Sequence, residues 1–336
     1  MTKQARTYVK EMLAGEGAGA FTVGKPLTFE RLSICPVLCT VKSKVGYLTY
    51  EEALEEGAIS VTEVGEHGTV PKLRLENKCD ERVLVIDGEQ VIGAKQNRIL
   101  NTTILVEAMS TLIIPVSCVE QGRWHYTGEK EMGSSRAPLY AKTRAMKSRQ
   151  VVNSLGMDMG YHADQSFIWH DISERLALNN ISSPSAAMEH HYAANAEILG
   201  KYQDFFAIDK FAEYKAGAMV GAVFALSGKI LGMDAFDKTE TLGKRWEQLL
   251  NSYAIEAERA EGNGELDPKS ARAFLRKAGE AGMKTFEPPG LGRDVRIVDE
   301  EVIGSALVFD GDVIHLYAFD TGRADGSRGK TYSTGT

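Results

Sequence analysis

The sequence predicts an α+β protein: an antiparallel sheet or sandwich-like N-terminal region, a helical middle, and a C-terminal region of hairpins and helices. Short runs rich in Val, Ile, Leu and Thr recur between residues 27 and 126, separated by turn residues, as expected of short strands. From residue 139 to residue 178 the apolar residues adopt helical spacing. Two apolar hairpins then turn at Ser227-Gly228 and at Asp310-Gly311, where glycine accepts the positive φ that such turns need.

The order of these patterns divides the chain into four regions. We expect a helix or arm at residues 1–26, with the helix ending at Gly15, and a mostly β region at 27–130 that includes one helix over 50–57. A helical region is expected at 131–215 and an α+β region at 216–336, with helices over 244–258 and 268–278. The last region is expected to pack with the β region as one unit. A further hairpin is predicted over 83–92, turning at Asp87-Gly88.

Composition excludes several classes of protein. The net charge of −7 disfavours a nucleic-acid binder, and no stretch reaches the roughly 20 apolar residues that cross a bilayer. Without a signal-peptide pattern at the N-terminus, we expect a soluble cytoplasmic protein. Cys35, Cys39, Cys79 and Cys118 form no C-x-x-C pair and are expected to be buried, reduced thiols.

The first candidate site is the run Lys95-Gln96-Asn97-Arg98, which lies between two predicted strands. An arginine beside an amide can hold a carboxylate or phosphate while the amide binds a ring or hydroxyl edge. The alternative is a solvated edge strand, because natural sheets often carry charge at their edges.

The second candidate is Glu120-Gln121-Gly122-Arg123-Trp124, which follows a buried strand. These residues supply a base, an anion-binding guanidinium group and a stacking plane, a combination suited to nucleotide-like ligands. The alternative is a structural ion pair between Arg123 and Glu120, with Trp124 anchored in the core.

A third feature is a segment without acidic residues, from Gly133 to Met157, which contains Arg136, Lys142, Arg144, Lys147 and Arg149. Such a segment in an acidic protein creates a positive field suited to a phosphorylated ligand. The alternative is that the basic side chains only solvate a helix, because at helical spacing they do not share one face.

Histidines provide weaker signals. His162, Asp164 and His170 could approach one another around a metal, but no H-E-x-x-H motif is present. No G-x-G-x-x-G, P-loop or G-x-S-x-G motif occurs, so the sequence identifies no cofactor and predicts no metal ligands. A metal-dependent hydrolase stays open as one alternative.

The run from Asp87 to Asn101, followed by the run from Ile114 to Trp124, resembles the ADP-ribosylglycohydrolase- and rhodanese-phosphatase-associated protein domain family. Residues 164–169 and the hairpin beginning at Gly221 are also similar, so the resemblance spans residues 27–319. It implies an association with ADP-ribose and phosphate metabolism rather than a defined activity. The motif positions that it implies are Glu89, Gln96, Asn97, Arg98, Glu120, Arg123 and Trp124.

Together these features give a hypothesis: the protein binds or processes an ADP-ribose-like or nucleotide-phosphate molecule. Arg98 and Arg123 would hold the phosphate, Trp124 would stack on the base, and Glu120 or Glu89 would be the general base. The other expected ligand-binding residues are Lys95, Gln96, Asn97, Gln121 and Arg136. The alternative from another class is a non-enzymatic scaffold or partner-binding protein whose polar clusters form a structural network. Sequence does not decide whether the protein is an enzyme, nor its oligomeric state.

Overall fold

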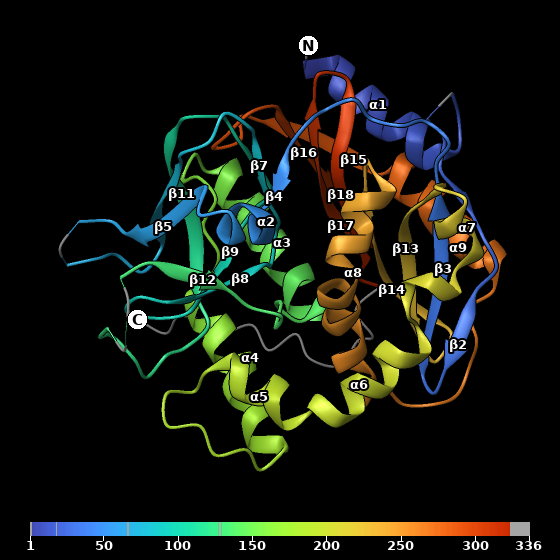
Figure 1. Ribbon diagram of the computed structural model, residues 1–336. Helices are drawn as coiled ribbons and strands as arrows, with labels where there is room; N and C mark the ends of the chain where they lie inside the picture. The colour runs from blue at the N-terminus through green and yellow to red at the C-terminus, as the bar shows by residue number, and fades with distance from the viewer. Residues whose placement is uncertain (1, 18, 66, 127, 129, 323–336) are drawn as a thin grey trace, which may run out of the picture.

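The computed structural model describes residues 2–17, 19–65, 67–126, 128 and 130–322. These residues form an α+β molecule with two β-rich parts, which confirms the predicted fold class (Figure 1). The larger part is a nine-stranded antiparallel sheet that combines strands from both ends of the chain. Its strands are β1 (Thr22–Val23), β2 (Leu27–Phe29), β3 (Leu32–Leu38), β13 (Met219–Leu226), β14 (Lys229–Phe236), β15 (Gly282–Phe286), β16 (Arg293–Val298), β17 (Val302–Phe309) and β18 (Asp312–Asp320).

The smaller part, which we call the β lobe, comprises residues 48–134. A three-stranded sheet and a six-stranded sheet enclose an apolar core of their own. Helix α2 (Tyr50–Glu55) packs on this lobe where a helix was predicted, and it begins with a capping box formed by Thr49 and Glu52. The strands are β4 (Leu48–Thr49), β5 (Ile59–Glu63), β6 (Lys72–Asn77), β7 (Val83–Val85), β8 (Gln90–Gly93), β9 (Arg98–Leu100), β10 (Ile104–Val106), β11 (Thr111–Cys118) and β12 (Met132–Ser134).

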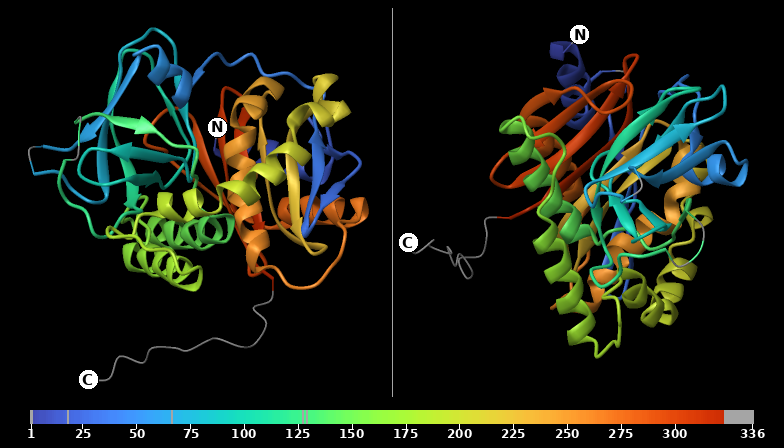
Figure 2. Two further views of the ribbon diagram at one scale, coloured as in Figure 1. Left: turned by 60° about the horizontal axis from the view of Figure 1, so that its bottom comes forward. Right: turned by 90° about the vertical axis from the view of Figure 1, so that its left-hand side faces the viewer.

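The helices cover both faces of the large sheet and fill the space beside the lobe (Figure 2). Helices α1 (Thr2–Ala14) and α9 (Pro268–Glu280) share one apolar core with the sheet. Helices α3 (Ala141–Gly156) and α8 (Thr239–Ala254) pack on the other face. None of the described helices has the length and apolar character needed to cross a bilayer. The remaining helices are α4 (Gln165–Leu178), α5 (Met188–Ala194), α6 (Ala196–Phe205) and α7 (Ala212–Lys215), with 3₁₀ turns at Ile208–Lys210 and Ile255–Arg259.

Two of the three predicted hairpins are confirmed. Ser227 and Gly228 have φ of 48° and 80°, and Asp310 and Gly311 have φ of 53° and 89°, so both turns have the two positive angles of a type I′ turn. The hairpin predicted over residues 83–92 is wrong, because β7 pairs with β4 and β10 whereas β8 pairs with β9 and β12. The intervening Asp87 forms an ion pair in the interior instead of occupying an exposed turn.

Cysteine placement follows the prediction in most respects. All four cysteines are unpaired, and Cys35, Cys39 and Cys118 are buried. Cys79 is half-buried, since it lies in the loop after β6 rather than within a strand.

Close backbone approach in the large sheet gives a first prediction. A Cβ atom at Gly221 would lie 2.6 Å from Cα of Ala235 on the neighbouring strand, so Gly221→Ala should destabilise the protein by about 1–3 kcal/mol. Gly200→Ala is the matched control: it lies within α6 with nothing within 4 Å of the added atom, and should stabilise by about 0.5–1 kcal/mol. Denaturant unfolding of both variants checks this, and equal effects would contradict it.

Candidate functional site

The two motif-bearing segments lie side by side because β9 and β11 pair in antiparallel fashion. This pairing places Arg98 directly opposite Cys118, so their side chains share one face of the sheet. Before β9 the chain turns sharply, with φ of 114° at Gly93 and 40° at Ala94. The turn brings residues 94–97 next to the segment that follows β11.

Arg123 and Glu120 form a buried ion pair at the centre of this arrangement. They are 8% and 6% exposed, and Arg123 Nε donates to Glu120 Oε2 at 2.8 Å. The terminal nitrogens of Arg123 donate to the carbonyl oxygens of Ala94 and His125 at 2.7 and 3.1 Å, and to Asn97 Oδ1 at 3.1 Å. Arg123 therefore braces the turn between β8 and β9, and its N–H groups point toward the protein interior.

Glu120 also joins the two motifs. Its carboxylate accepts from the Asn97 backbone at 3.2 Å, and its carbonyl oxygen accepts from Gln96 Nε2 at 3.0 Å. Burial opposes ionisation of Glu120, but the hydrogen bond from Arg123 and other donors outweigh it, so the pKa of Glu120 lies below its usual value. Gln121, the next residue, is exposed.

Arg98 differs from Arg123 because its charge is poorly compensated. Its side chain is fully buried, and its Nε donates to the Val70 carbonyl oxygen at 3.1 Å. Both terminal nitrogens lack a hydrogen-bond partner among the described residues, and Nη2 lies 3.6 Å from the nearest oxygen of Glu63. Burial lowers the pKa of Arg98. The guanidinium carbon lies 5.5 Å from the ring centroid of Trp124.

Trp124, which contacts the buried Arg98, is itself partly exposed at the surface. Its side chain is 43% exposed, and Lys95 Nζ lies 5.5 Å from its ring centroid and from that of Tyr126. The same Nζ donates to the His67 carbonyl oxygen at 2.7 Å. We call this set the Arg98–Trp124 cluster; it comprises Lys95, Gln96, Asn97, Arg98, Glu120, Arg123 and Trp124.

Two residues proposed from sequence have their contacts elsewhere. The Glu89 carboxylate is buried and accepts from Arg245 Nη2 of α8 at 2.7 Å. Burial raises the pKa of Glu89 despite that partner. Arg136 is exposed and lies 3.3 Å from Glu247, also on α8. The two acids considered as general bases therefore have separate partners.

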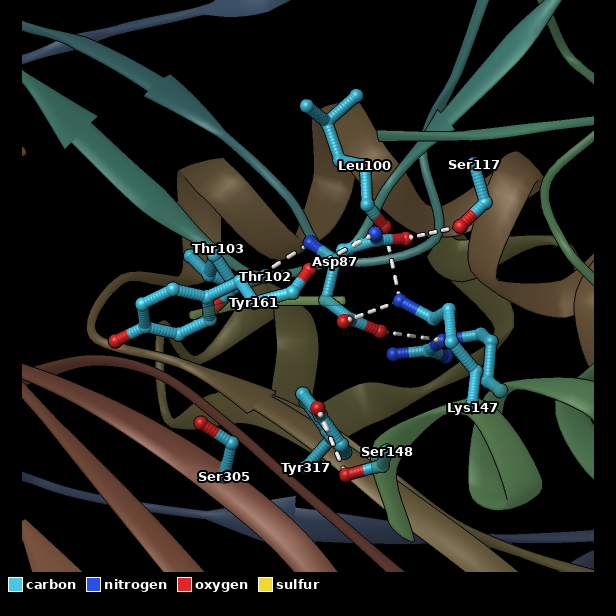
Figure 3. Close-up of polar contacts among 12 residues, drawn as sticks. Asp87, Leu100, Thr102, Thr103, Ser117, Lys147, Ser148, Tyr161, Ser305 and Tyr317 are labelled. Atoms are coloured by element: carbon cyan, nitrogen blue, oxygen red, sulfur yellow. Dashed lines mark hydrogen bonds and ion pairs between the residues drawn. The ribbon is translucent and has the colours of Figure 1, made fainter. Parts of the chain in front are cut away.

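A second polar cluster, which the sequence reasoning did not identify, lies between the β lobe and the large sheet. Lys147 of α3 is fully buried and donates to Asp87 at 2.6 Å and to the Leu100 carbonyl oxygen at 2.9 Å (Figure 3). Arg144, one turn earlier on α3, binds Asp234 of β14 through two hydrogen bonds of 2.8 and 3.1 Å. We call Asp87, Arg144, Lys147 and Asp234 the interfacial ion-pair chain. It links the lobe to the sheet through α3.

The charged groups of the interfacial ion-pair chain shift one another's pKa values. Burial lowers the pKa of Lys147 to about 8 despite the attraction of Asp87. Burial raises the pKa of Asp234, but Arg144 and other donors outweigh it and leave the pKa below its usual value. His315 of β18 extends the chain, since its Nε2 lies 3.3 Å from Asp234 and its Nδ1 lies 2.8 Å from Thr103 Oγ1 of the lobe.

These contacts also account for the segment without acidic residues. The basic side chains of this segment have acidic or carbonyl partners elsewhere in the protein. Helix α3 therefore supplies positive charge to acids on the lobe, the sheet and the 3₁₀ turn that follows α8. The signal in the sequence was the i, i+3 spacing of Arg144 and Lys147, which places both on one helix face. The partners are Glu247 for Arg136, Glu256 for Lys142, Asp234 for Arg144, Asp87 for Lys147 and the Asp299 carbonyl oxygen for Arg149.

Comparison with known proteins identifies the family. Residues 20–319 match the family described as the ARG and Rhodanese-Phosphatase-superfamily-associated Protein domain. The chain belongs to this family. No curated protein and no solved structure matches the chain. The family match covers the lobe, both polar clusters and nearly all of the large sheet.

In this family member, Asp164 has a local structural role. It is the N-cap of α4, and its Oδ1 accepts from the backbone of Ser166 and Phe167 at 2.9 and 3.2 Å. Within the ranges that the structure describes, no group of three or more His, Cys, Asp or Glu side chains is arranged to hold a metal ion. His162 and His170 are both exposed.

The interfacial ion-pair chain gives a second prediction. Lys147→Met removes the 2.6 Å partner of Asp87 and leaves Arg144 Nε, 3.5 Å away, as its nearest basic group among the described residues, and should reduce the free energy of unfolding by about 3–5 kcal/mol. Adding Asp87→Asn removes the stranded charge and should restore much of that loss, which denaturant unfolding of the single and double variants measures. The control is Lys201→Met in an exposed pair with Glu197, expected to change stability by less than about 1 kcal/mol. Additive effects of the two buried substitutions would refute the pairing.

Proposed function

We propose that the protein binds a phosphate-bearing, nucleotide-like ligand of the ADP-ribose class at the Arg98–Trp124 cluster. The observation that carries the proposal is the Arg98 guanidinium group, which is fully buried with two nitrogens lacking hydrogen-bond partners among the described residues. Arg98 keeps one hydrogen bond to Val70 and a 3.6 Å contact with Glu63, but buried donors without a hydrogen bond cost about 1–3 kcal/mol each, and a phosphoryl group is well shaped to satisfy them.

Trp124 supports the nucleotide part of the proposal. An exposed indole ring offers a stacking surface for a base, worth about 1–3 kcal/mol per base. The Trp124 ring centroid lies 5.5 Å from the Arg98 guanidinium carbon, and in our proposal the indole moves aside to admit the phosphate to that group. The family description names an association with ARG and the rhodanese-phosphatase superfamily, and this supports a phosphate-related ligand.

The geometry supports binding more strongly than it supports acid–base catalysis. A general base works best with a pKa near the working pH, whereas the pKa of Glu120 is lowered by its bond to Arg123. In the proposed complex Glu120 and Arg123 position the turn that carries Lys95 and Gln96. Glu89, the other acid considered as a base, is buried against Arg245 and lies outside the Arg98–Trp124 cluster.

Calorimetric titration with ADP-ribose tests the proposal. Trp124→Ala should weaken binding by about 10- to 100-fold, whereas Trp124→Phe, which retains a stacking ring, should weaken it less. Arg98→Lys keeps the charge but loses the planar pair of donors, and should weaken ADP-ribose and ADP more than adenosine. Lys201→Ala, at an exposed pair on α6, is the control and should bind normally. No binding of ADP-ribose by the unaltered protein at millimolar concentration would end the proposal.

A structural role for the cluster is the second candidate, favoured by the buried bonds of Arg123. Lysine at this position supplies fewer donors and a different shape, so Arg123→Lys should leave acceptors unsatisfied and lower stability by about 2–4 kcal/mol. Calorimetric melting measures the loss. If Arg123→Lys melts at the temperature of the unaltered protein, Arg123 does not brace the turn and the structural role is excluded.

A further inference from the structure

Two carboxylates lie near the buried guanidinium group of Arg98, and they differ in how their charge is compensated. Glu120 is paired with Arg123, whose Nε donates to Glu120 Oε2 at 2.8 Å. Glu63, the last residue of β5, has its Oε1 3.6 Å from Nη2 of Arg98 and has no other basic partner in the part of the chain that the structure describes. The charge of Glu63 therefore adds to any negative charge that a ligand brings to Arg98.

The backbone around Glu63 holds its carboxylate in place. The side chain is 2% exposed, and its Oε1 accepts from the backbone N–H of Lys95 at 3.3 Å. Gly68 packs so closely against the same carboxylate that a Cβ atom at this glycine would lie 2.9 Å from Oε2. Because turning toward solvent would require these neighbours to rearrange, the carboxylate stays beside Arg98 when a ligand binds.

Arg98 and Glu63 together carry no net charge, and this limits the charge that a bound phosphate can have. The guanidinium group attracts each negative charge on the phosphate while the carboxylate repels it, so a second charge gains little from the pair. The cost of removing an ion from water rises with the square of its charge, so a dianion costs about four times as much to bury as a monoanion. A singly charged phosphate group is therefore favoured.

The free donors of Arg98 fit the same kind of group. Its Nη1 and Nη2 both lack a hydrogen-bond partner among the described residues. Two nitrogens match the two non-bridging oxygens of a phosphodiester, or of a phosphate within a diphosphate linkage. A terminal phosphate has a third such oxygen, for which Arg98 has no further donor because its Nε is bonded to the Val70 carbonyl oxygen.

We propose that Glu63 makes this site selective for a phosphate group with one negative charge, as in a phosphodiester or a diphosphate linkage. Terminal phosphate groups, which carry two charges, are disfavoured by repulsion from Glu63. The inference rests on the function proposed for the Arg98–Trp124 cluster and narrows its ligand class to molecules whose Arg98-bound phosphate is linked on two sides, as in ADP-ribose. Glu63 is then a specificity-determining residue of the site.

Competition calorimetry against ADP-ribose tests the selectivity with two probes, AMP and the methyl phosphodiester of AMP. Both have the same base and sugar, but at about pH 8 the phosphate of AMP carries two charges and that of the methyl ester one, because a phosphate monoester has a second pKa of about 6. The methyl ester should bind at least about tenfold more tightly than AMP. If ADP-ribose binds but AMP competes as well as its methyl ester, the selectivity is refuted and the proposed function stands. If ADP-ribose does not bind, both are refuted.

Substitution of Glu63 tests whether this side chain causes the preference. Glu63→Gln keeps the shape and the acceptor for the Lys95 N–H but removes the charge, so AMP should bind about tenfold more tightly and the preference for the methyl ester should largely disappear. The control is Glu107→Gln, which makes the same change in net charge at an exposed position between β10 and β11 and should keep the preference. An unchanged preference in folded Glu63→Gln would exclude Glu63 as the determinant. If that variant does not fold, the two probes on the unaltered protein still decide the selectivity.

Discussion

The arrangement of this molecule depends on the ion pairs that α3 makes between the β lobe and the large sheet. Lys147 and Arg144 project from one face of the helix, one to Asp87 in the lobe and the other to Asp234 in the sheet. Removing such charges from water is expensive, and only short, well-directed bonds recover the cost. The contacts of 2.6 and 2.8 Å meet that requirement, and through α3 they join the lobe to the sheet by buried charges.

The elements that sequence predicted well are those governed by local chemistry. The turns at Ser227-Gly228 and Asp310-Gly311 carry the residue types that positive φ requires, and the apolar stripe of Trp246, Leu249 and Leu250 is buried along α8. The hairpin expected at Asp87-Gly88 had the same local form. It failed because β7 pairs with β4 and β10 while β8 pairs with β9 and β12, and no local pattern contains that long-range pairing.

The candidate site shows the same division. Two polar runs could be singled out because three or four polar side chains stand together beside strands, and antiparallel pairing of β9 and β11 makes those runs neighbours. The two runs do not show by themselves that Arg123 is well hydrogen-bonded whereas the terminal nitrogens of Arg98 are not. Arg123 has a glutamate three residues earlier, whereas the surroundings of Arg98 come from the loop around Val70 and from Glu63. The sequence also could not predict the contact of Arg136, because its partner Glu247 lies far away in the chain, on α8.

The pairing of β3 with β13 has a consequence for how the chain acquires its shape during synthesis. These strands are neighbours in the sheet, yet residues 39–218 separate them in the chain, and β18 must insert between β14 and β17. Because of this separation, β3 leaves the ribosome long before β13 has been made. Closing so long a loop is also entropically costly and slows folding. The β lobe, whose strands all lie within residues 48–134, can assemble in the interval. Until β13 is made, the residues that β3 buries in the finished sheet lack that partner strand, and such transiently exposed apolar surface is prone to aggregation.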